Sequence, residues 1–224
     1  MEDASSRPRW ELLLALMMAL AAVGTAWAGF QSAKWSGVQA DSYAAAGAAR
    51  AEAGQAATVA SRQRTIDVVS FTAWLNALNA EIVANPAARP SGNYQPDPDQ
   101  VSGFLFNRFR PDFRPAVGAW LATRPLLNPA APATPFDMPE YRLAAEAASQ
   151  ELVEEAERQS ATARAANQRS DNYVLTAVIF ALVLLFAGLA SKSRNRTTQN
   201  TLTGLALAAL AGCVLTLAFF PVEV

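Results

Sequence analysis

The sequence predicts an all-α integral membrane protein with three transmembrane helices, and three observations support this fold class. Residues 12–30, 173–190 and 202–222 form uncharged apolar segments, each about as long as a helix that crosses roughly 30 Å of hydrocarbon. Charged residues make up only 17% of the chain, below the roughly 25% of a typical soluble domain. Alanine, the strongest helix former, is abundant between the first two segments, where no alternating strand pattern is sustained.

The first apolar segment also has features of a cleaved signal sequence. Arg7 and Arg9 precede it, and Ala26-Trp27-Ala28 near its end fits a signal-peptidase site. However, the segment is longer than most signal-peptide apolar cores, and the sequence after it continues as helix. We therefore interpret residues 12–30 as a retained span that follows a short tail, residues 1–11.

Basic residues at one end of the spans predict the orientation of the chain. The loop 191–201 contains no acidic residue, and short basic segments stay in the cytoplasm. Residues 31–172 and the C-terminal residues 223–224 would then lie outside. The residues that determine this topology are Arg7, Arg9, Lys192, Arg194 and Arg196.

Proline divides the extracytoplasmic region into two helical arms and a looped head. Nearly all prolines of the chain lie between Pro86 and Pro139, and proline is costly inside helices. The proline-free, alanine-rich residues 31–64 and 139–172 are therefore predicted as arms. The second arm is expected to begin near Pro139, because proline suits a first helical turn.

The two arms run directly into membrane spans, so we expect them to form an antiparallel, coiled-coil-like hairpin. In that hairpin the numbers of facing residues add up to about 202, and opposite charges meet. The alternative is that each arm contacts neighbouring subunits instead. The expected pairs are Arg50 with Glu151 and Glu154, Asp41 with Arg158 or Arg164, and Arg62 with Glu140.

Residues 65–138 are expected to form a small distal head of helix and irregular loop. An apolar stripe with helical spacing continues past the hairpin and needs a partner, which the aromatic segment after it offers. The stripe consists of Ile66, Val68, Val69, Phe71, Trp74, Leu75, Leu78 and Ile82. The aromatic segment consists of Phe104, Phe106, Phe109, Phe113, Val117, Trp120 and Leu121.

Arginines alternate with aromatic residues in this segment, which makes it the main candidate for partner or ligand contact. Guanidinium groups bind anions bidentately and stack on aromatic rings, so the segment fits a surface for an anionic ligand, a lipid headgroup or a partner protein. The other interpretation, which we favour, is a proline-stiffened strap whose phenylalanines cap the head core and whose arginines are solvated or paired. The candidate contact residues are Arg108, Arg110, Arg114, Phe109, Phe113 and Trp120.

The third span carries small residues at four-residue spacing, namely Gly204, Ala208, Gly212 and Thr216. Such a ladder allows helices to pack closely in a bilayer, and it favours a homo-oligomer. No ionisable residue lies inside a span, which argues against proton-coupled transport. A pore is still compatible with the sequence, because Thr176, Thr203, Thr216 or small residues could line one in an oligomer.

The sequence offers little for catalysis, metal binding or nucleic-acid binding. The chain has no histidine and one cysteine, which removes the commonest general base and any intrachain disulfide. The acidic residues Glu151, Glu154, Glu155 and Glu157 fit a solvated or salt-bridged helix face better than a metal site. A net charge of −1 argues against nucleic-acid binding. We expect no enzymatic activity, no cofactor and no metal.

Several motifs resemble those of known proteins. They are Trp35-Ser-Gly-Val-Gln-Ala40, Phe109-Arg-Pro-Asp-Phe-Arg-Pro-Ala-Val-Gly-Ala-Trp120, Asn128-Pro-Ala-Ala-Pro and Met138-Pro-Glu-Tyr141. With them the chain resembles, over most of its length, a family of bacterial three-span membrane proteins of unknown function. The resemblance implies a protein of the bacterial inner membrane and implies no activity, cofactor or functional residue.

Together these features predict a non-enzymatic, oligomeric structural or accessory subunit of a bacterial envelope membrane assembly. Its partners would be the lipid bilayer, further copies of the chain and a second envelope membrane protein. One alternative is an oligomeric ion channel or pore with an extracytoplasmic helical crown. A third class is an envelope sensor that binds a ligand at the head.

Overall fold

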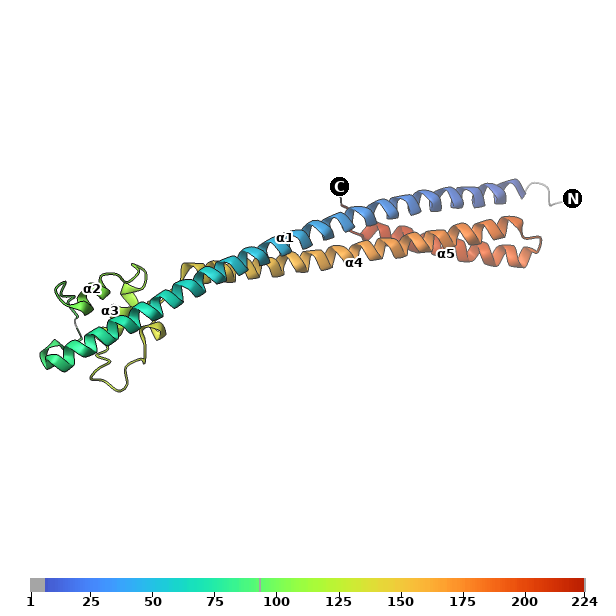
Figure 1. The fold of residues 1–224 in the computed structure, drawn as a ribbon. Coiled ribbons are helices and arrows are strands. Elements are labelled where there is room, and N and C mark those ends of the chain that lie inside the picture. The colour runs from blue at the N-terminus through green and yellow to red at the C-terminus, as the bar shows by residue number, and fades with distance from the viewer. Residues whose placement is uncertain (1–6, 93, 224) are drawn as a thin grey trace. The chain divides into compact units, whose positions relative to one another are not determined.

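The computed structural model describes residues 7–92 and 94–223, with side chains from Trp10 onward. This part of the chain contains helices and no strand (Figure 1), which confirms the all-α fold class for it. The α-helices are α1 (Arg7–Ala84), α2 (Val101–Phe106), α3 (Arg114–Ala122), α4 (Ala144–Lys192) and α5 (Arg196–Phe219). Two short 3-10 helices are η1 (Pro86–Ala88) and η2 (Pro135–Asp137).

The three predicted spans lie in α1, α4 and α5, the helices of the described chain that are long and apolar enough to cross a membrane. The expected loop 191–201 is wrong, because α4 continues to Lys192 and α5 begins at Arg196. Only residues 193–195 separate the two helices. The side chain of Asn195 accepts a hydrogen bond from the backbone N–H of Thr197 at 2.9 Å and caps α5, so the polar residues after it are helical.

The described chain divides into two compact units. The first contains residues up to Gly47 and residues from Glu157, and the second contains residues 48–156. α1 and α4 each contribute to both units.

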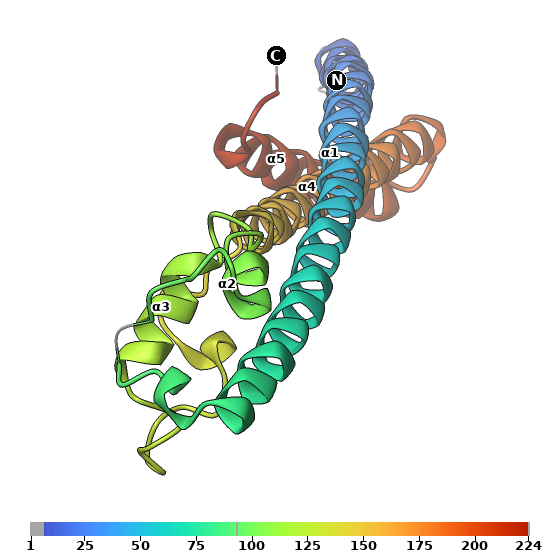
Figure 2. The same ribbon diagram turned by 60° about the vertical axis from the view of Figure 1, so that its left-hand side comes forward.

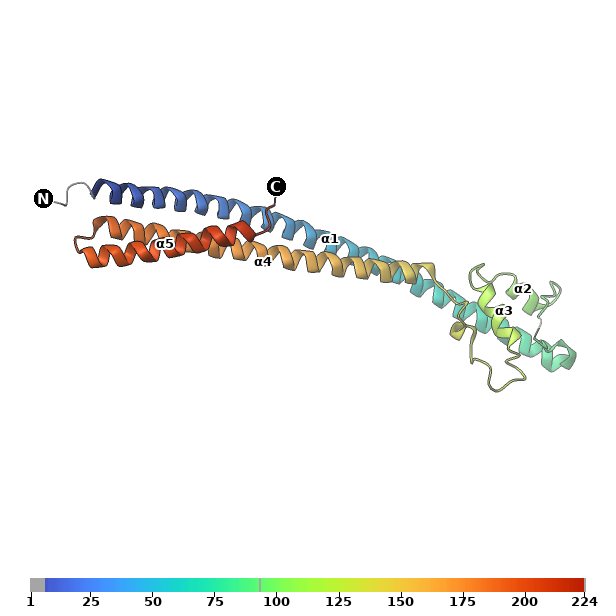
Figure 3. The ribbon, with the colours of Figure 1, turned by 180° about the vertical axis from the view of Figure 1, so that it is seen from behind.

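In the first unit, α1, α4 and α5 lie side by side around an apolar core (Figures 1 and 3). Gly24 of α1 allows close packing, since a Cβ atom there would collide with the ring of Phe180 on α4. Outside this core, these helices expose leucines, as their length and apolar composition for a membrane span would predict. The core consists of Leu14, Met17, Ala21, Phe180, Val183, Ala187, Ala190, Ala206, Leu210 and Cys213. Exposed leucines include Leu16, Leu20, Leu182, Leu189, Leu205 and Leu215.

In the second unit, the C-terminal part of α1 packs against α3 and the residues before it (Figure 2). This contact confirms that the stripe from Phe71 onward and the aromatic segment from Phe106 onward are partners, whereas Phe104 is exposed. The rings of Phe113 and Phe136 stack with centroids 5.3 Å apart. The buried core consists of Phe71, Trp74, Leu78, Phe109, Phe113, Ala116, Val117, Trp120 and Leu121.

The stripe on α1 differs from the prediction at its N-terminal end. Ile66, Val68 and Val69 are exposed, and Asp67 is fully buried instead. The buried positions 67, 71, 74 and 78 are spaced by three or four residues and therefore share one helix face. A buried carboxylate thus shares the helix face of the apolar side chains, in place of the three residues that are exposed.

The expected helix start at Pro139 is also wrong, because α4 begins at Ala144. Residues before it form a turn in which Arg142 Nε donates to the carbonyl of Pro139 at 3.1 Å. The ring of Tyr141 lies 5.7 Å from that of Phe113 and 5.1 Å from that of Phe136. Packing of Tyr141 into the head core therefore overrides the local helix preference.

Candidate functional site

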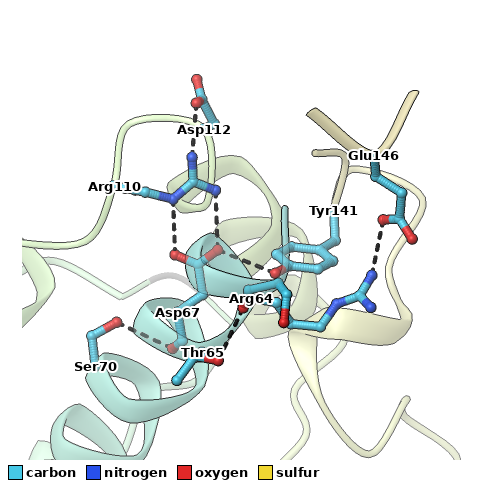
Figure 4. A network of polar contacts seen from close by, with 9 residues as sticks. Arg64, Thr65, Asp67, Ser70, Arg110, Asp112, Tyr141 and Glu146 are labelled. Carbon is cyan, nitrogen blue, oxygen red and sulfur yellow. Dashed lines mark hydrogen bonds and ion pairs between the residues drawn. The ribbon is translucent and has the colours of Figure 1, made fainter. Parts of the chain in front are cut away.

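The head contains a buried polar network that links α1 to the segments before α3 and before α4 (Figure 4). Arg110 donates to both carboxylate oxygens of Asp67, from Nε to Oδ1 at 3.1 Å and from Nη2 to Oδ2 at 3.0 Å. The hydroxyl of Tyr141 donates to Oδ2 of Asp67 at 3.1 Å. Arg110 makes one further contact, from Nη1 to Oδ2 of Asp112 at 3.1 Å. Asp67 therefore accepts three hydrogen bonds, as a buried carboxylate requires.

The groups around Asp67 keep their protons at neutral pH. The hydrogen bond to Asp67 raises the pKa of Arg110 above its usual value. Burial, followed by the negative charge of Asp67, raises the pKa of Tyr141 to about 12. Nearby, the charge of Glu146 raises the pKa of Arg64, and the two side chains form an exposed ion pair at 2.9 Å. This arrangement holds three segments together through fixed charges and donors.

All three candidate arginines make contacts inside the head. Besides the contacts of Arg110, the Cζ atom of Arg108 lies 3.5 Å from the ring centroid of Phe104. Arg114 donates to two backbone carbonyls, those of Phe109 at 3.1 Å and Asn107 at 2.6 Å. Of the two interpretations of this segment, the strap with paired arginines fits these contacts.

The aromatic members of the candidate contact set are inside the head. Phe109, Phe113 and Trp120 are buried, and Trp120 Nε1 donates to the carbonyl of Pro132 at 2.8 Å. A partner cannot reach these rings unless the head opens. They stabilise the core rather than provide an exposed surface.

A second polar cluster in the first unit holds the residues that follow α5. Gln31 of α1 is fully buried. Its side chain donates to the carbonyl of Glu223 at 3.1 Å and accepts from the N–H of Glu223 at 2.9 Å. Trp35 Nε1 and the hydroxyl of Tyr173 both donate to the carbonyl of Pro221 at 3.1 Å. We call Gln31, Trp35 and Tyr173 the C-terminal clamp.

Sequence reasoning missed the C-terminal clamp. The residue types of Trp35 and Tyr173 could have indicated them, because aromatic residues with a polar group are frequent where helices leave a membrane. For Gln31, the sequence shows only that it is the first polar residue after the apolar segment. Its partner is a backbone group near the other end of the chain, which no local pattern indicates.

The small-residue ladder of α5 faces away from the other two helices of its unit. Gly204, Ala208, Gly212 and Thr216 are all exposed. A Cβ atom added at Gly204 or Gly212 would meet nothing within 4 Å. The face that α5 buries is a different one, formed by Thr203, Ala206, Leu210 and Cys213.

A shallow groove runs along one edge of the ladder. Its volume is about 420 Å³, and Gly212 and Thr216 of α5 line it together with Leu175 and Ile179 of α4. Small side chains of α5 and larger ones of α4 line this mostly apolar surface, and the small ones allow another helix to approach closely.

Three of the basic residues predicted to set the topology lie at the α4–α5 turn. Lys192, Arg194 and Arg196 are exposed there. The side chains of Arg7 and Arg9 lie outside the part of the chain that the structure describes. Within that part, no three His, Cys, Asp or Glu side chains come together as a metal site would require, the acidic residues 151–157 included.

Comparison of the chain with protein-family models, with curated proteins and with solved structures finds no match. The interpretation of the site therefore depends on the residues and contacts described above.

Proposed function

We propose that this protein is a non-enzymatic, oligomeric structural or accessory subunit of a bacterial envelope membrane assembly. It would lie in the inner membrane with its N-terminus inside, as the basic α4–α5 turn favours. The observation that carries the proposal is the exposed ladder of α5, an open face of small residues inside a predicted span.

The ladder supports an oligomer because lipid removes the hydrophobic force between membrane helices. Their association then depends on close contact and dispersion, which small side chains allow. The chain has already used a different face of α5 for its own packing against α1 and α4. Gly204 and Gly212 therefore leave room for a helix from a second copy, which would complete the packing.

Helix length supports the placement of α1 and α4 partly outside the bilayer. Within the first unit, α1 covers residues 7–47 and α4 covers residues 157–192. At 1.5 Å per residue these lengths are about 60 Å and about 55 Å. The hydrocarbon is only about 30 Å thick, so both helices extend beyond it. With a cytoplasmic α4–α5 turn, the extension is extracytoplasmic.

Contacts between α1 and α4 support the antiparallel hairpin. In the first unit, the hydroxyls of Ser32 and Ser170 lie 2.9 Å apart. In the second unit, Ser149 Oγ donates to the carbonyl of Ala53 at 3.0 Å. In both pairs the residue numbers add up to 202, the value that the hairpin requires.

The oligomer can be tested by native mass spectrometry of the full chain released from lipid nanodiscs. Wild-type protein should appear as an oligomer. Gly212→Ile fills the ladder and should shift the distribution to the monomer. Val214→Phe adds bulk at another exposed position, about 160° around the helix from Gly212, and should leave the oligomer intact. Monomeric wild-type protein, or equal effects of both substitutions, would contradict the proposal.

The channel alternative makes a different prediction for the same sample. Thr176 and Thr203, two of the residues that could line a pore, are buried within the chain. Only Thr216 lies on the open face. The accessory-subunit proposal predicts no ion flux into liposomes that contain the protein alone. It also predicts that a second envelope protein copurifies in mild detergent. Steady flux without a partner would favour a pore instead.

A further inference from the structure

A polar cavity lies in the first unit, where α1 begins and α4 turns into α5. Its volume is about 540 Å³. Ser193, Arg194, Arg196 and Gln199 line it from the turn and the start of α5. From α1 it receives Trp10 and Glu11. Among the described lining residues, the charged groups are two guanidinium groups and one carboxylate.

Trp10, one of the lining residues, carries a buried hydrogen-bond donor that lacks an acceptor. Among the residues that the structure describes, the indole Nε1 of Trp10 is buried and has no hydrogen-bond partner. Indole N–H can only donate, and a buried donor without an acceptor destabilises the fold. The N-terminus of α5 adds the positive end of a 24-residue helix at the same place. The described lining therefore combines guanidinium groups, a residue with an unused indole donor and a helix N-terminus, groups that bind an oxyanion.

Apolar residues border the cavity on the side of the spans. Leu14, which also lines it, is buried and belongs to the apolar core of α1, α4 and α5. The cavity thus lies where the apolar segments end, at the depth of lipid headgroups, and Trp10 has the amphipathic ring that is frequent at that depth. A ligand with an anionic group attached to acyl chains fits both sides of the cavity.

We propose that this cavity binds the headgroup of an anionic phospholipid, with Arg194 and Arg196 at the phosphate and Trp10 donating to one of its oxygens. Basic cavities between membrane helices bind such headgroups through charge-assisted hydrogen bonds. This inference depends on the membrane placement in the proposed function. It adds to that placement a specific ligand and the residues that bind it.

The test is a titration of the full chain in detergent with phosphatidylglycerol, with the retained lipid counted by native mass spectrometry. Arg194→Gln removes a lining charge, and Trp10→Phe removes the indole N–H without any change of charge. Each should weaken retention about fivefold to tenfold. Lys192→Gln is the matched control, because it removes one exposed charge at the same turn from a residue outside the lining. Its effect should be several-fold smaller.

Three outcomes would overturn the inference. Equal losses for Lys192→Gln and Arg194→Gln would mean diffuse attraction to an anionic surface. Unchanged retention in Trp10→Phe would remove the indole from the site. Equal retention of zwitterionic phosphatidylcholine, or full competition by millimolar inorganic phosphate, would mean that an anionic lipid is not the ligand.

Flotation with phosphatidylcholine vesicles separates this inference from the membrane placement. Wild-type protein and the three variants should all float with the vesicles, because their apolar spans are unchanged. If wild-type protein does not float, the membrane placement fails and the lipid site fails with it. If all four float but bind phosphatidylglycerol alike, only the lipid site fails.

Discussion

The buried pair of Asp67 and Arg110 supplies the sharpest prediction for the head. The side chain of Asp67 is 0% exposed, whereas that of Arg110 is 21% exposed. Arg110→Met leaves a buried carboxylate with the Tyr141 hydroxyl as its remaining side-chain donor. Loss of one partner of a buried ion pair costs about 3–5 kcal/mol. Because Tyr141 still donates to Asp67, we expect a cost of about 3 kcal/mol.

The opposite substitution should cost less. Asp67→Asn keeps the shape of the side chain, and the guanidinium that it leaves behind has partial access to water and retains Asp112. We expect about 1.5–2 kcal/mol, the lower part of the range for hydrogen bonds that involve a charged group. Asp112→Asn is the control, since Asp112 is 73% exposed and exposed ion pairs contribute at most about 1 kcal/mol. The expected cost therefore falls from Arg110→Met to Asp67→Asn to Asp112→Asn, because the group left unpaired or removed is progressively more exposed.

Amide hydrogen exchange of α3 in the full chain, reconstituted in nanodiscs, measures these costs locally. A loss of about 3 kcal/mol corresponds to exchange that is about a hundredfold faster. Arg110→Met should therefore accelerate exchange most, and Asp112→Asn should change it little. The double variant Arg110→Met with Asp67→Leu should recover part of the loss, because no charge is left buried. If Asp67→Asn proved more costly than Arg110→Met, the reasoning would be refuted.

Three further predictions concern single contacts. Folding raises the pKa of Tyr141 from 10.0 to about 12, so the contribution of its hydroxyl to stability is complete below pH 10 and is lost as the pH rises through about 12. In alkaline unfolding, Tyr141→Phe should therefore lose less stability over that range than wild type. Equal losses would contradict the raised pKa. Gly103→Ala places a Cβ atom against the backbone of Asp97 and should cost about 1–3 kcal/mol of stability. Gly118→Ala adds a Cβ atom with nothing within 4 Å and should stabilise α3 by up to about 1 kcal/mol. Thermal unfolding that ranks the two variants the other way would refute this packing argument. Gln31→Leu should accelerate exchange of the Glu223 amide at least tenfold through loss of its acceptor, and unchanged exchange would show that the C-terminal clamp does not hold this residue.

The sequence predicts the spans and the head partners well because these depend on local patterns. An apolar run of about 20 residues is a property of one segment, and the helical spacing of Phe71, Trp74 and Leu78 indicates one buried face. The aromatic segment that covers this face is close in the chain and has few other apolar surfaces to meet.

The remaining features depend on contacts that no local pattern shows. Asp67 interrupts the apolar stripe, and a charged residue in a helix is usually exposed. Only the fold shows that Arg110 and Tyr141 allow this carboxylate to be buried. Pro139 favours a helix start, but the packing of Tyr141 delays α4 to Ala144. Likewise, the spacing of the ladder on α5 indicates a packing face, while only the fold shows that this face points away from α1 and α4.

The most direct test of the membrane placement is the accessibility of single cysteines in intact spheroplasts. With Cys213→Ala as background, Ser91→Cys puts a thiol at an exposed position of the head, and Thr198→Cys puts one near the α4–α5 turn. We predict that a membrane-impermeant maleimide labels Ser91→Cys at once and labels Thr198→Cys only after permeabilisation. Labelling of Thr198→Cys in intact cells, or protection of Ser91→Cys, would contradict a three-span protein with an extracytoplasmic head.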